Sequence, residues 1–172
     1  PWCPPDAVTL GSMPTLVLVR HAQAAYNYPD RARPLTKAGR DQAARLGVTL
    51  AREIGAFDVA VSSDAQRARE TFAAILARVD TDDSWHDRSI YDGGEEEIIE
   101  LARTFTGETG LIVGHEPVIS YAGYILAHQE DRGAADRGVP TATALVLSFE
   151  GAWEDLAPGT CAVRVFYTPP TR

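Results

Sequence analysis

The chain contains only two cysteines, Cys3 and Cys161, and no long apolar run. Two cysteines cannot form a framework of several disulfides, and their separation does not match a zinc site, so we expect a reducing compartment, by default the cytoplasm. A helix that crosses a bilayer needs ~18 or more consecutive apolar residues. No stretch of this sequence reaches that length, and we expect no membrane partner.

Positive charge is scarce as well. The chain has 16 Lys and Arg residues against 24 Asp and Glu residues, a formal net charge of -8 at pH 7. Proteins that bind nucleic acid need a basic face, so we expect no nucleic-acid partner, and any anion site must be a local positive pocket. The length of 172 residues, with 45% hydrophobic residues, is sufficient for one domain with its own core.

Residues 1–12 differ from the rest of the sequence. They begin with a proline-rich stretch that has no periodicity, and Gly11-Ser12 precedes Met13, the only methionine. A Gly-Ser pair before a lone methionine is typical of an expression tag, and a native disordered extension is the alternative. We therefore expect one domain at residues 13–172.

Short apolar runs alternate with segments of helical periodicity along this domain. Strands are expected at residues 16–19, 58–62, 111–114, 142–149 and 161–167, with a weaker strand or extended segment at 89–91. Helices are expected at residues 37–54, 65–77 and 95–105 and from residue 117 onward. Thr36 can cap the helix at 37–54. This order predicts an α/β fold, a three-layer α/β/α sandwich around a mostly parallel sheet with later edge strands.

Two of the expected strands end in a histidine. Arg20 and His21 follow the apolar run at 16–19, and His115 follows the run at 111–114. In open α/β sheets the carboxyl ends of parallel strands meet at one edge, where ligands bind. We expect a site at that edge formed by Arg20, His21, Asn27, Arg67 and His115, with Asp92 in a loop on the same side.

These residue types suit phosphoryl chemistry on histidine. The guanidinium groups of Arg20 and Arg67 and the imidazole of His115 can bind the non-bridging oxygens of a phosphoryl group. Positive surroundings keep the His21 ring neutral and nucleophilic, and we expect its other ring nitrogen to donate to a backbone carbonyl or a carboxylate. Attack on phosphorus then needs no metal or other cofactor. Asp92 is the candidate general acid, because a nearby phosphate raises the pKa of a carboxyl group.

Three motifs follow one another in order: Arg20-His21-Ala22 with Asn27, Ser63-Asp64-Ala65-Gln66-Arg67-Ala68 with Thr71, and Gly114-His115-Glu116-Pro117. Together with the segment at 34–39 they resemble the histidine phosphatase superfamily, also called phosphoglycerate mutase-like. The resemblance covers nearly everything after Met13. It implies a phosphoglycerate mutase-like fold, His21 as the phosphorylated nucleophile, and a phosphate pocket lined by Arg20, Asn27, Arg67 and His115. Asp92 lies where larger members carry a glutamate acid.

Departures from the family pattern indicate which members of the family this sequence resembles. Ala22 replaces the usual glycine after the nucleophile, which is similar to the small SixA-type phosphohistidine phosphatases. Ser63-Asp64 stands where the family usually has Ser-Pro. The chain lacks the long insertions that larger mutases and sugar phosphatases use as lids, and an open site suits a substrate carried by a protein.

The sequence therefore predicts a metal-independent phosphatase that acts through a phosphohistidine intermediate on His21, with phosphohistidine in a protein as its substrate. A phosphomonoesterase for a small sugar phosphate or nucleotide is the alternative within enzymes. An inactive module that binds phosphoproteins is a third interpretation, although binding alone needs no nucleophile beside two arginines. A metal site of histidines with Asp58 or Asp64 is disfavoured, because the sequence has no His-x-His or His-x-x-x-His pairing.

Overall fold

The computed structural model describes residues 11, 13–26 and 28–171. Residues 1–10 and 12, nearly all of the expected tag, lie outside the described residues, as does Asn27. The strands are β1 (Thr15–Arg20), β2 (Ala56–Ser63), β3 (Asp80–Asp87), β4 (Thr109–Gly114), β5 (Thr143–Ser148) and β6 (Ala162–Tyr167). The α-helices are α1 (Lys37–Glu53), α2 (Gln66–Leu76), α3 (Ser89–Asp92), α4 (Glu95–Arg103) and α5 (Val118–Leu126). Short 3-10 helices are η1 (Asp30–Ala32), η2 (Gln129–Ala134) and η3 (Trp153–Asp155).

The six strands form one sheet in the order β3-β2-β4-β1-β5-β6. The first four strands in this order are parallel, whereas β5 runs antiparallel to both β1 and β6. Arg20 is in register with Gly114, so β1 and β4 end at the same edge of the sheet, and β2 lies parallel beside β4. This edge receives both His21 and His115.

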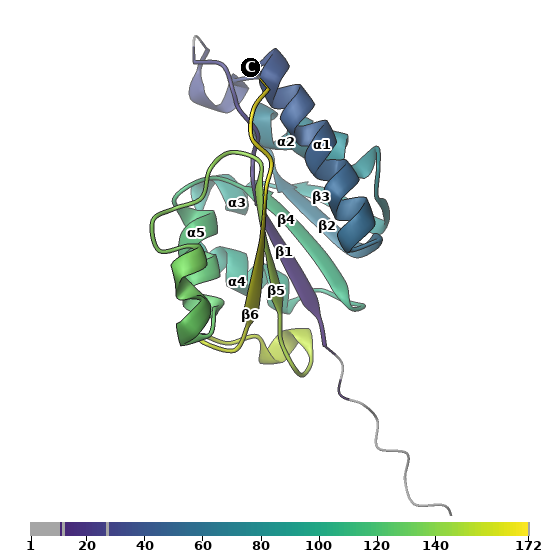
Figure 1. Cartoon of the computed structure of the whole chain (residues 1–172), viewed down its shortest axis with the longest axis vertical. Helices are drawn as coiled ribbons and strands as arrows, with labels where there is room; N and C mark the ends of the chain where they lie inside the picture. The colour runs from purple at the N-terminus through teal and green to yellow at the C-terminus, as the bar shows by residue number, and fades with distance from the viewer. Residues whose placement is uncertain (1–10, 12, 27, 172) are drawn as a thin grey trace, which may run out of the picture.

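Helices cover both faces of the sheet, with α1 and α2 on one side and α3, α4 and α5 on the other (Figure 1). Val17 and Val19 of β1 pack into the core with α1 and α2, whereas Leu16 and Leu18 pack into the core on the opposite face. Successive side chains of a strand point to opposite faces, so one apolar run supplies both layers of core. The predicted three-layer sandwich is confirmed.

The strand expected at 89–91 is wrong. Tyr91 lies in α3, and the strand that precedes it is β3, which pairs with β2 and is the edge strand of the described sheet. Four of the eight residues of β3 are aspartates, which have low strand propensity and hide the strand from a search for apolar periodicity. The same charges suit an exposed edge, because they discourage pairing with another chain.

Helix α1 begins where the sequence predicts. The Thr36 hydroxyl accepts a hydrogen bond from the Gly39 amide at 2.9 Å. Gly39 also packs against the loop that follows β1, because a Cβ atom at this position would lie 1.9 Å from the carbonyl oxygen of Gln23. Only glycine fits there, so the loop that carries His21 rests directly on the first turn of α1.

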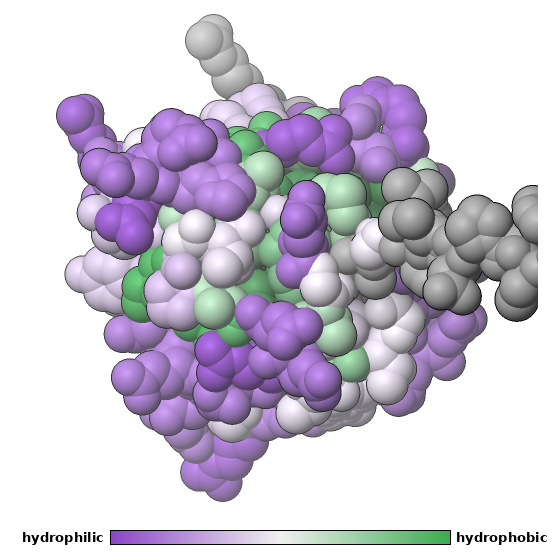
Figure 2. Space-filling view, turned by 90° about the horizontal axis from the view of Figure 1, so that it is seen from below, coloured by the Kyte–Doolittle hydropathy of each residue, from purple (hydrophilic) through white to green (hydrophobic). Residues whose placement is uncertain are grey.

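The end of the molecule at the amino ends of the strands has a mostly hydrophilic surface, with apolar side chains between the polar ones (Figure 2). This end lies opposite the edge that carries His21 and His115. Among the residues that the structure describes, no helix combines the length and apolar character needed to cross a membrane.

Candidate active site

His21 follows the last residue of β1 and is buried, with 7% of its surface exposed. Its amide donates to the carbonyl oxygen of Gly114 at 3.0 Å, which ties the ends of β1 and β4 together. Its ring atom Nδ1 lies 2.7 Å from the carbonyl oxygen of Ala22. A carbonyl oxygen only accepts hydrogen bonds, so Nδ1 carries the proton and the ring lone pair is on Nε2.

A second contact of the ring leads to the same tautomer. Arg67, in the first turn of α2, donates from Nε to His21 Nε2 at 3.2 Å. A guanidinium N–H only donates, so Nε2 must be the acceptor. Burial is the main cause that lowers the pKa of His21 to about 3, and nearby His115, Arg67 and Arg20 act in the same direction. The imidazole is therefore neutral at pH 7, with an unprotonated Nε2.

A buried hydroxyl group on α2 holds the backbone beside His21. The Ala22 amide donates to Thr71 Oγ1 at 3.0 Å, and the Thr71 hydroxyl donates to the Arg67 carbonyl oxygen at 2.8 Å. Thr71 and Ala22 are both fully buried. These two bonds link the segment after β1 to the helix that carries Arg67, and they position the imidazole and the guanidinium relative to each other.

His115 follows β4 and lies next to His21, with ring centroids 5.3 Å apart. Its Nε2 lies 2.8 Å from the hydroxyl oxygen of Ser63, the last residue of β2. Its Nδ1 is buried and has no hydrogen-bond partner among the described residues. Burial, followed by the charge of Arg67, lowers the pKa of His115 to about 4. Two neutral imidazoles therefore lie side by side at this edge.

Two arginine side chains supply positive charge. Arg67 is 6% exposed, and its Nη1 and Nη2 donate to the carbonyl oxygen and the carboxylate of Asp30 at 2.6 and 3.1 Å. Arg20 donates from Nη1 to the Val139 carbonyl oxygen at 2.7 Å, and its Nε is buried without a partner in the described part of the chain. A bound oxyanion would satisfy the two unpaired nitrogens, Arg20 Nε and His115 Nδ1.

Asp30 and Tyr91 also belong to the site, although the sequence patterns do not indicate them. The Asp30 carboxylate accepts hydrogen bonds from Arg67 Nη2 at 3.1 Å and from the Tyr91 hydroxyl at 2.7 Å. The bond from Tyr91 is the largest of the effects that lower the pKa of Asp30 to about 2. The Tyr91 ring also meets the His115 ring edge to face, with centroids 5.4 Å apart. One signal was available, since Asp30 is the only acidic residue of the sequence between His21 and the segment at 34–39.

Asp92, the expected general acid, lies in α3 on the exposed rim rather than in a loop. Its carboxylate pairs with Arg31 at 2.9 Å and with Arg88 at 2.7 Å. The hydrogen bond from Arg88, more than any other effect, lowers the pKa of Asp92. A carboxyl group that two cations keep ionised is a poor proton donor, so this arrangement speaks against a general-acid role.

The structure thus brings together Arg20, His21, Arg67 and His115, leaves Asp92 on the rim, and does not describe Asn27. In the described part of the chain, no group of three or more His, Cys, Asp or Glu side chains is arranged to hold a metal ion. An unprotonated ring nitrogen beside guanidinium groups can attack a bound phosphoryl group.

Known proteins are similar to this chain in fold and in sequence. A profile of the histidine phosphatase superfamily (branch 1) matches residues 16–92. A protein of Mycobacterium tuberculosis, described as uncharacterized, is 32% identical over 160 residues, which are 88% of this chain and 99% of that protein. A solved structure assigned as the phosphohistidine phosphatase SixA of Nakamurella multipartitia has a TM-score of 0.81 and 34% identity, over 91% of this chain and 97% of that chain. The protein histidine phosphatase SixA complexed with tungstate has a TM-score of 0.74 and 18% identity, over 90% and 97% of the two chains.

The sheet topology and these matches define a phosphatase with the phosphoglycerate mutase-like fold. A phosphoglycerate mutase of Plasmodium falciparum shares that fold, with a TM-score of 0.62 at 18% identity. The chain belongs to the histidine phosphatase superfamily. The family and the enzyme class predicted from the sequence are confirmed.

Proposed function

We propose that this protein is a metal-independent phosphatase that works through a phosphohistidine intermediate on His21, and that phosphohistidine in a protein is its physiological substrate. The state of the His21 ring carries the proposal. Its Nδ1 proton is engaged by the Ala22 carbonyl, and its Nε2 lone pair is held beside the Arg67 guanidinium. Transfer of an anionic phosphoryl group requires a nucleophile beside a fixed cation, whereas binding alone does not.

The proposed chemical steps use these groups directly. The phosphoryl oxygens bind Arg20, Arg67 and His115, and Asn27 is a further proposed ligand. His21 Nε2 attacks phosphorus in line, and the leaving group departs with the electron pair of its bond to phosphorus. Water then attacks the phosphorus atom on phosphorylated His21 and loses a proton to solvent, and inorganic phosphate is released. The electron pair of the broken P–N bond returns to Nε2 and restores the neutral ring.

The carboxyl groups at this edge favour a phosphohistidine substrate over a sugar phosphate. An imidazole that carries a proton on its other ring nitrogen leaves phosphorus as a neutral molecule, whereas the alkoxide of a sugar needs a proton from a general acid. Hydrogen bonds lower the pKa values of both Asp30 and Asp92, the first mainly through Tyr91 and the second mainly through Arg88. Neither group is therefore a ready proton donor in the ligand-free enzyme. The likeness to the Nakamurella multipartitia protein, assigned as a phosphohistidine phosphatase, further supports this substrate class.

Hydrolysis of p-nitrophenyl phosphate in excess EDTA tests the mechanism. The parent protein is compared with His21→Ala and with the control His128→Ala, whose ring contacts the Gly159 carbonyl oxygen away from the site. We expect EDTA-resistant turnover that His21→Ala abolishes and His128→Ala retains. Turnover that EDTA abolishes would indicate a metal hydrolase, and turnover that persists in His21→Ala would exclude the histidine intermediate.

The substrate class needs a second comparison. The parent is given a phosphohistidine peptide and, separately, glucose 6-phosphate and a nucleoside monophosphate, and kcat/KM is measured from phosphate release. A higher kcat/KM for the peptide supports the proposal, and a higher value for either metabolite replaces it with the small-molecule phosphomonoesterase. Binding of the peptide without release of phosphate from any of the substrates would indicate a binding module.

We also propose that the protein resides in the cytoplasm. Cys161 is a free, buried thiol, and burial raises its pKa to about 11. A thiol with so little thiolate at neutral pH reacts slowly with other thiols and disulfides, so the cysteine serves as a small apolar core residue. This use of cysteine suits a reducing compartment.

A further inference from the structure

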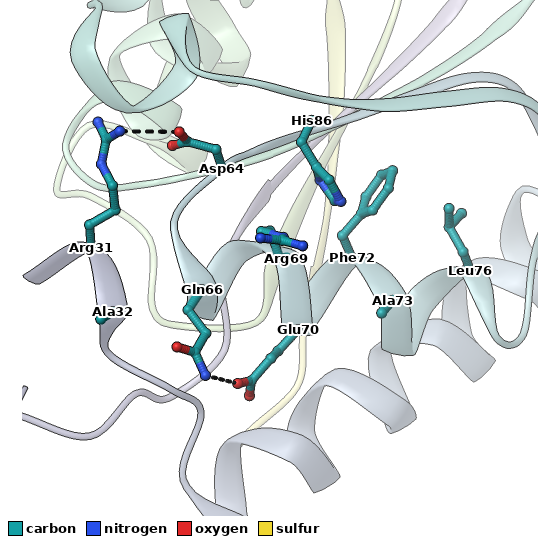
Figure 3. Close-up of a pocket in the computed structure, with 10 residues that line it drawn as sticks. All are labelled: Arg31, Ala32, Asp64, Gln66, Arg69, Glu70, Phe72, Ala73, Leu76 and His86. Carbon is teal, nitrogen blue, oxygen red and sulfur yellow. Dashed lines mark hydrogen bonds and ion pairs between the residues drawn. The ribbon is translucent and has the colours of Figure 1, made fainter.

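A pocket with a volume of about 870 Å³ lies beside the site, between η1, the exposed side of α2 and the edge strand β3 (Figure 3). We call it the flank pocket, and its lining includes Arg69, Phe72, Ala73, Leu76 and His86. Two other lining residues are chain neighbours of site residues, since Arg31 follows Asp30 and Gln66 precedes Arg67. These neighbours in the chain place the flank pocket beside the phosphate site.

The floor of the flank pocket is apolar and already ordered. Phe72, Ala73 and Leu76 come from one side of α2 (Figure 3). The Phe72 ring packs edge to face on His86, with centroids 5.5 Å apart, and His86 Nδ1 lies 2.8 Å from the Ser62 hydroxyl oxygen. Phe72 belongs to the core and Leu76 packs against it, so little conformational entropy is lost from these side chains when a ligand covers them.

The lining of the flank pocket holds two arginines and two carboxylates, and one of the arginines has no partner among the described residues. The Asp64 carboxylate pairs with Arg31 at 3.1 Å, and the Glu70 carboxylate accepts hydrogen bonds from the Leu35 amide and the Gln66 amide group at 3.0 and 2.9 Å. Arg69 is exposed, and its guanidinium has no ion-pair or hydrogen-bond partner among the described residues. The pocket thus offers an apolar surface beside an unpaired guanidinium, which can bind a carboxylate of the ligand that covers the surface.

We propose that the flank pocket binds the polypeptide segment next to the phosphorylated residue of a protein substrate, with an apolar side chain against α2 and an Asp or Glu carboxylate on Arg69. This inference rests on the proposed function and names the sequence context that the enzyme selects. An extended peptide advances ~3.3 Å per residue, so the residues that reach the pocket lie within a few positions of the phosphorylated one. The preference would distinguish protein substrates that carry the same phosphoryl group.

Two synthetic phosphohistidine peptides test the inference. One carries Leu and Asp on each side of the phosphohistidine, and the other carries Gln and Ser at the same positions. The readout is the ratio of kcat/KM for each peptide to kcat/KM for p-nitrophenyl phosphate, which has no flanking segment. A charge-assisted hydrogen bond with apolar burial is worth ~10-fold in this ratio, so the parent should prefer the Leu-Asp peptide by about that factor.

Matched variants locate the preference on the protein. Arg69→Glu reverses the charge in the flank pocket, whereas Arg78→Glu makes the same change at an exposed residue just after α2 and outside the pocket. Ala73→Tyr fills the pocket, and Ala77→Tyr places the same ring at an exposed position that does not line it. We expect Arg69→Glu and Ala73→Tyr to abolish the ~10-fold preference and the two controls to retain it within about 2-fold.

Equal use of the two peptides by the parent would overturn the inference, as would an equal loss of preference in Arg69→Glu and Arg78→Glu. Failure of the proposed function has a different signature. In that case the parent would hydrolyse neither peptide, or p-nitrophenyl phosphate turnover would be independent of His21, whatever residues flank the phosphohistidine. Hydrolysis of both peptides at one rate would leave the proposed function intact and remove only the role of the flank pocket.

Discussion

Mild acid should destabilise this protein through its two active-site histidines. Burial is the main cause that lowers the pKa of His21 to about 3 and that of His115 to about 4. In the unfolded chain both rings take up protons near the ordinary value of about 6.5. Below that pH the unfolded state binds more protons than the folded state, so stability falls as the pH falls. Stability stops falling once the pH drops below the pKa values of the folded protein, about 3 for His21 and about 4 for His115.

The magnitude follows from the two pKa values of each ring. A group that titrates only in the unfolded state changes the free energy of unfolding by ~1.4 kcal/mol per pH unit inside its window. Between about pH 7.5 and about pH 5.0, each histidine therefore removes about 2 kcal/mol of stability, and the pair removes about 4 kcal/mol. A domain of ordinary stability has ~5–15 kcal/mol in total, so the effect is large enough to measure directly.

Urea unfolding at the two pH values provides the assay. The variants His21→Gln and His115→Gln should each lose about 2 kcal/mol less than the parent between about pH 7.5 and about pH 5.0, and the double variant about 4 kcal/mol less. The comparison is between pH values for one protein, so the constant cost of lost packing and hydrogen bonds cancels. If both variants lose as much stability as the parent, the rings take up protons in the folded protein near the ordinary pKa of about 6.5, and burial does not keep His21 neutral in mild acid.

Three further predictions concern single contacts. Arg67→Lys replaces a rigid fork of donors with one ammonium group, and we expect kcat/KM for p-nitrophenyl phosphate to fall ~100-fold in steady-state assays. Thr71→Val leaves the buried Ala22 amide without its acceptor and should lower the urea-derived free energy of unfolding by ~1–3 kcal/mol; an unchanged value would mean that the bond contributes nothing. Asp92→Asn should keep kcat for a phosphohistidine peptide within about 3-fold, because the carboxylate is held ionised on the rim; a ~100-fold loss would restore Asp92 as the general acid.

Local patterns account for the parts of the fold that the sequence predicts correctly. The apolar runs that become β1, β2 and β4 and the cap at Thr36 depend on neighbouring residues alone. The position of His21 and His115 directly after such runs places them at one sheet edge, because parallel strands point the same way. Apolar runs do not predict β3, because its aspartates suit an edge position that only the complete sheet defines.

Contacts between distant segments account for what the sequence analysis misses. Asp30 reaches Arg67 across 37 positions of the chain, and His115 reaches Ser63 across 52. Such pairings depend on how loops fold back over the sheet, and no local pattern encodes them. Asp92 combines a local and a distant contact, because its pKa is lowered most by Arg88, four positions before it, and also by Arg31 of η1.

The sequence by itself determined the family, the alternation of strands and helices, and the delivery of two histidines and two arginines to one edge, because these follow from periodicity and from the order of motifs along the chain. Only the tertiary structure decided which nitrogen of His21 is free, which carboxylate lies beside Arg67, and that Asp92 stays on the rim. The physical reason is that protonation and charge depend on burial and on partners within a few ångströms, and the packing of loops from different parts of the chain sets both.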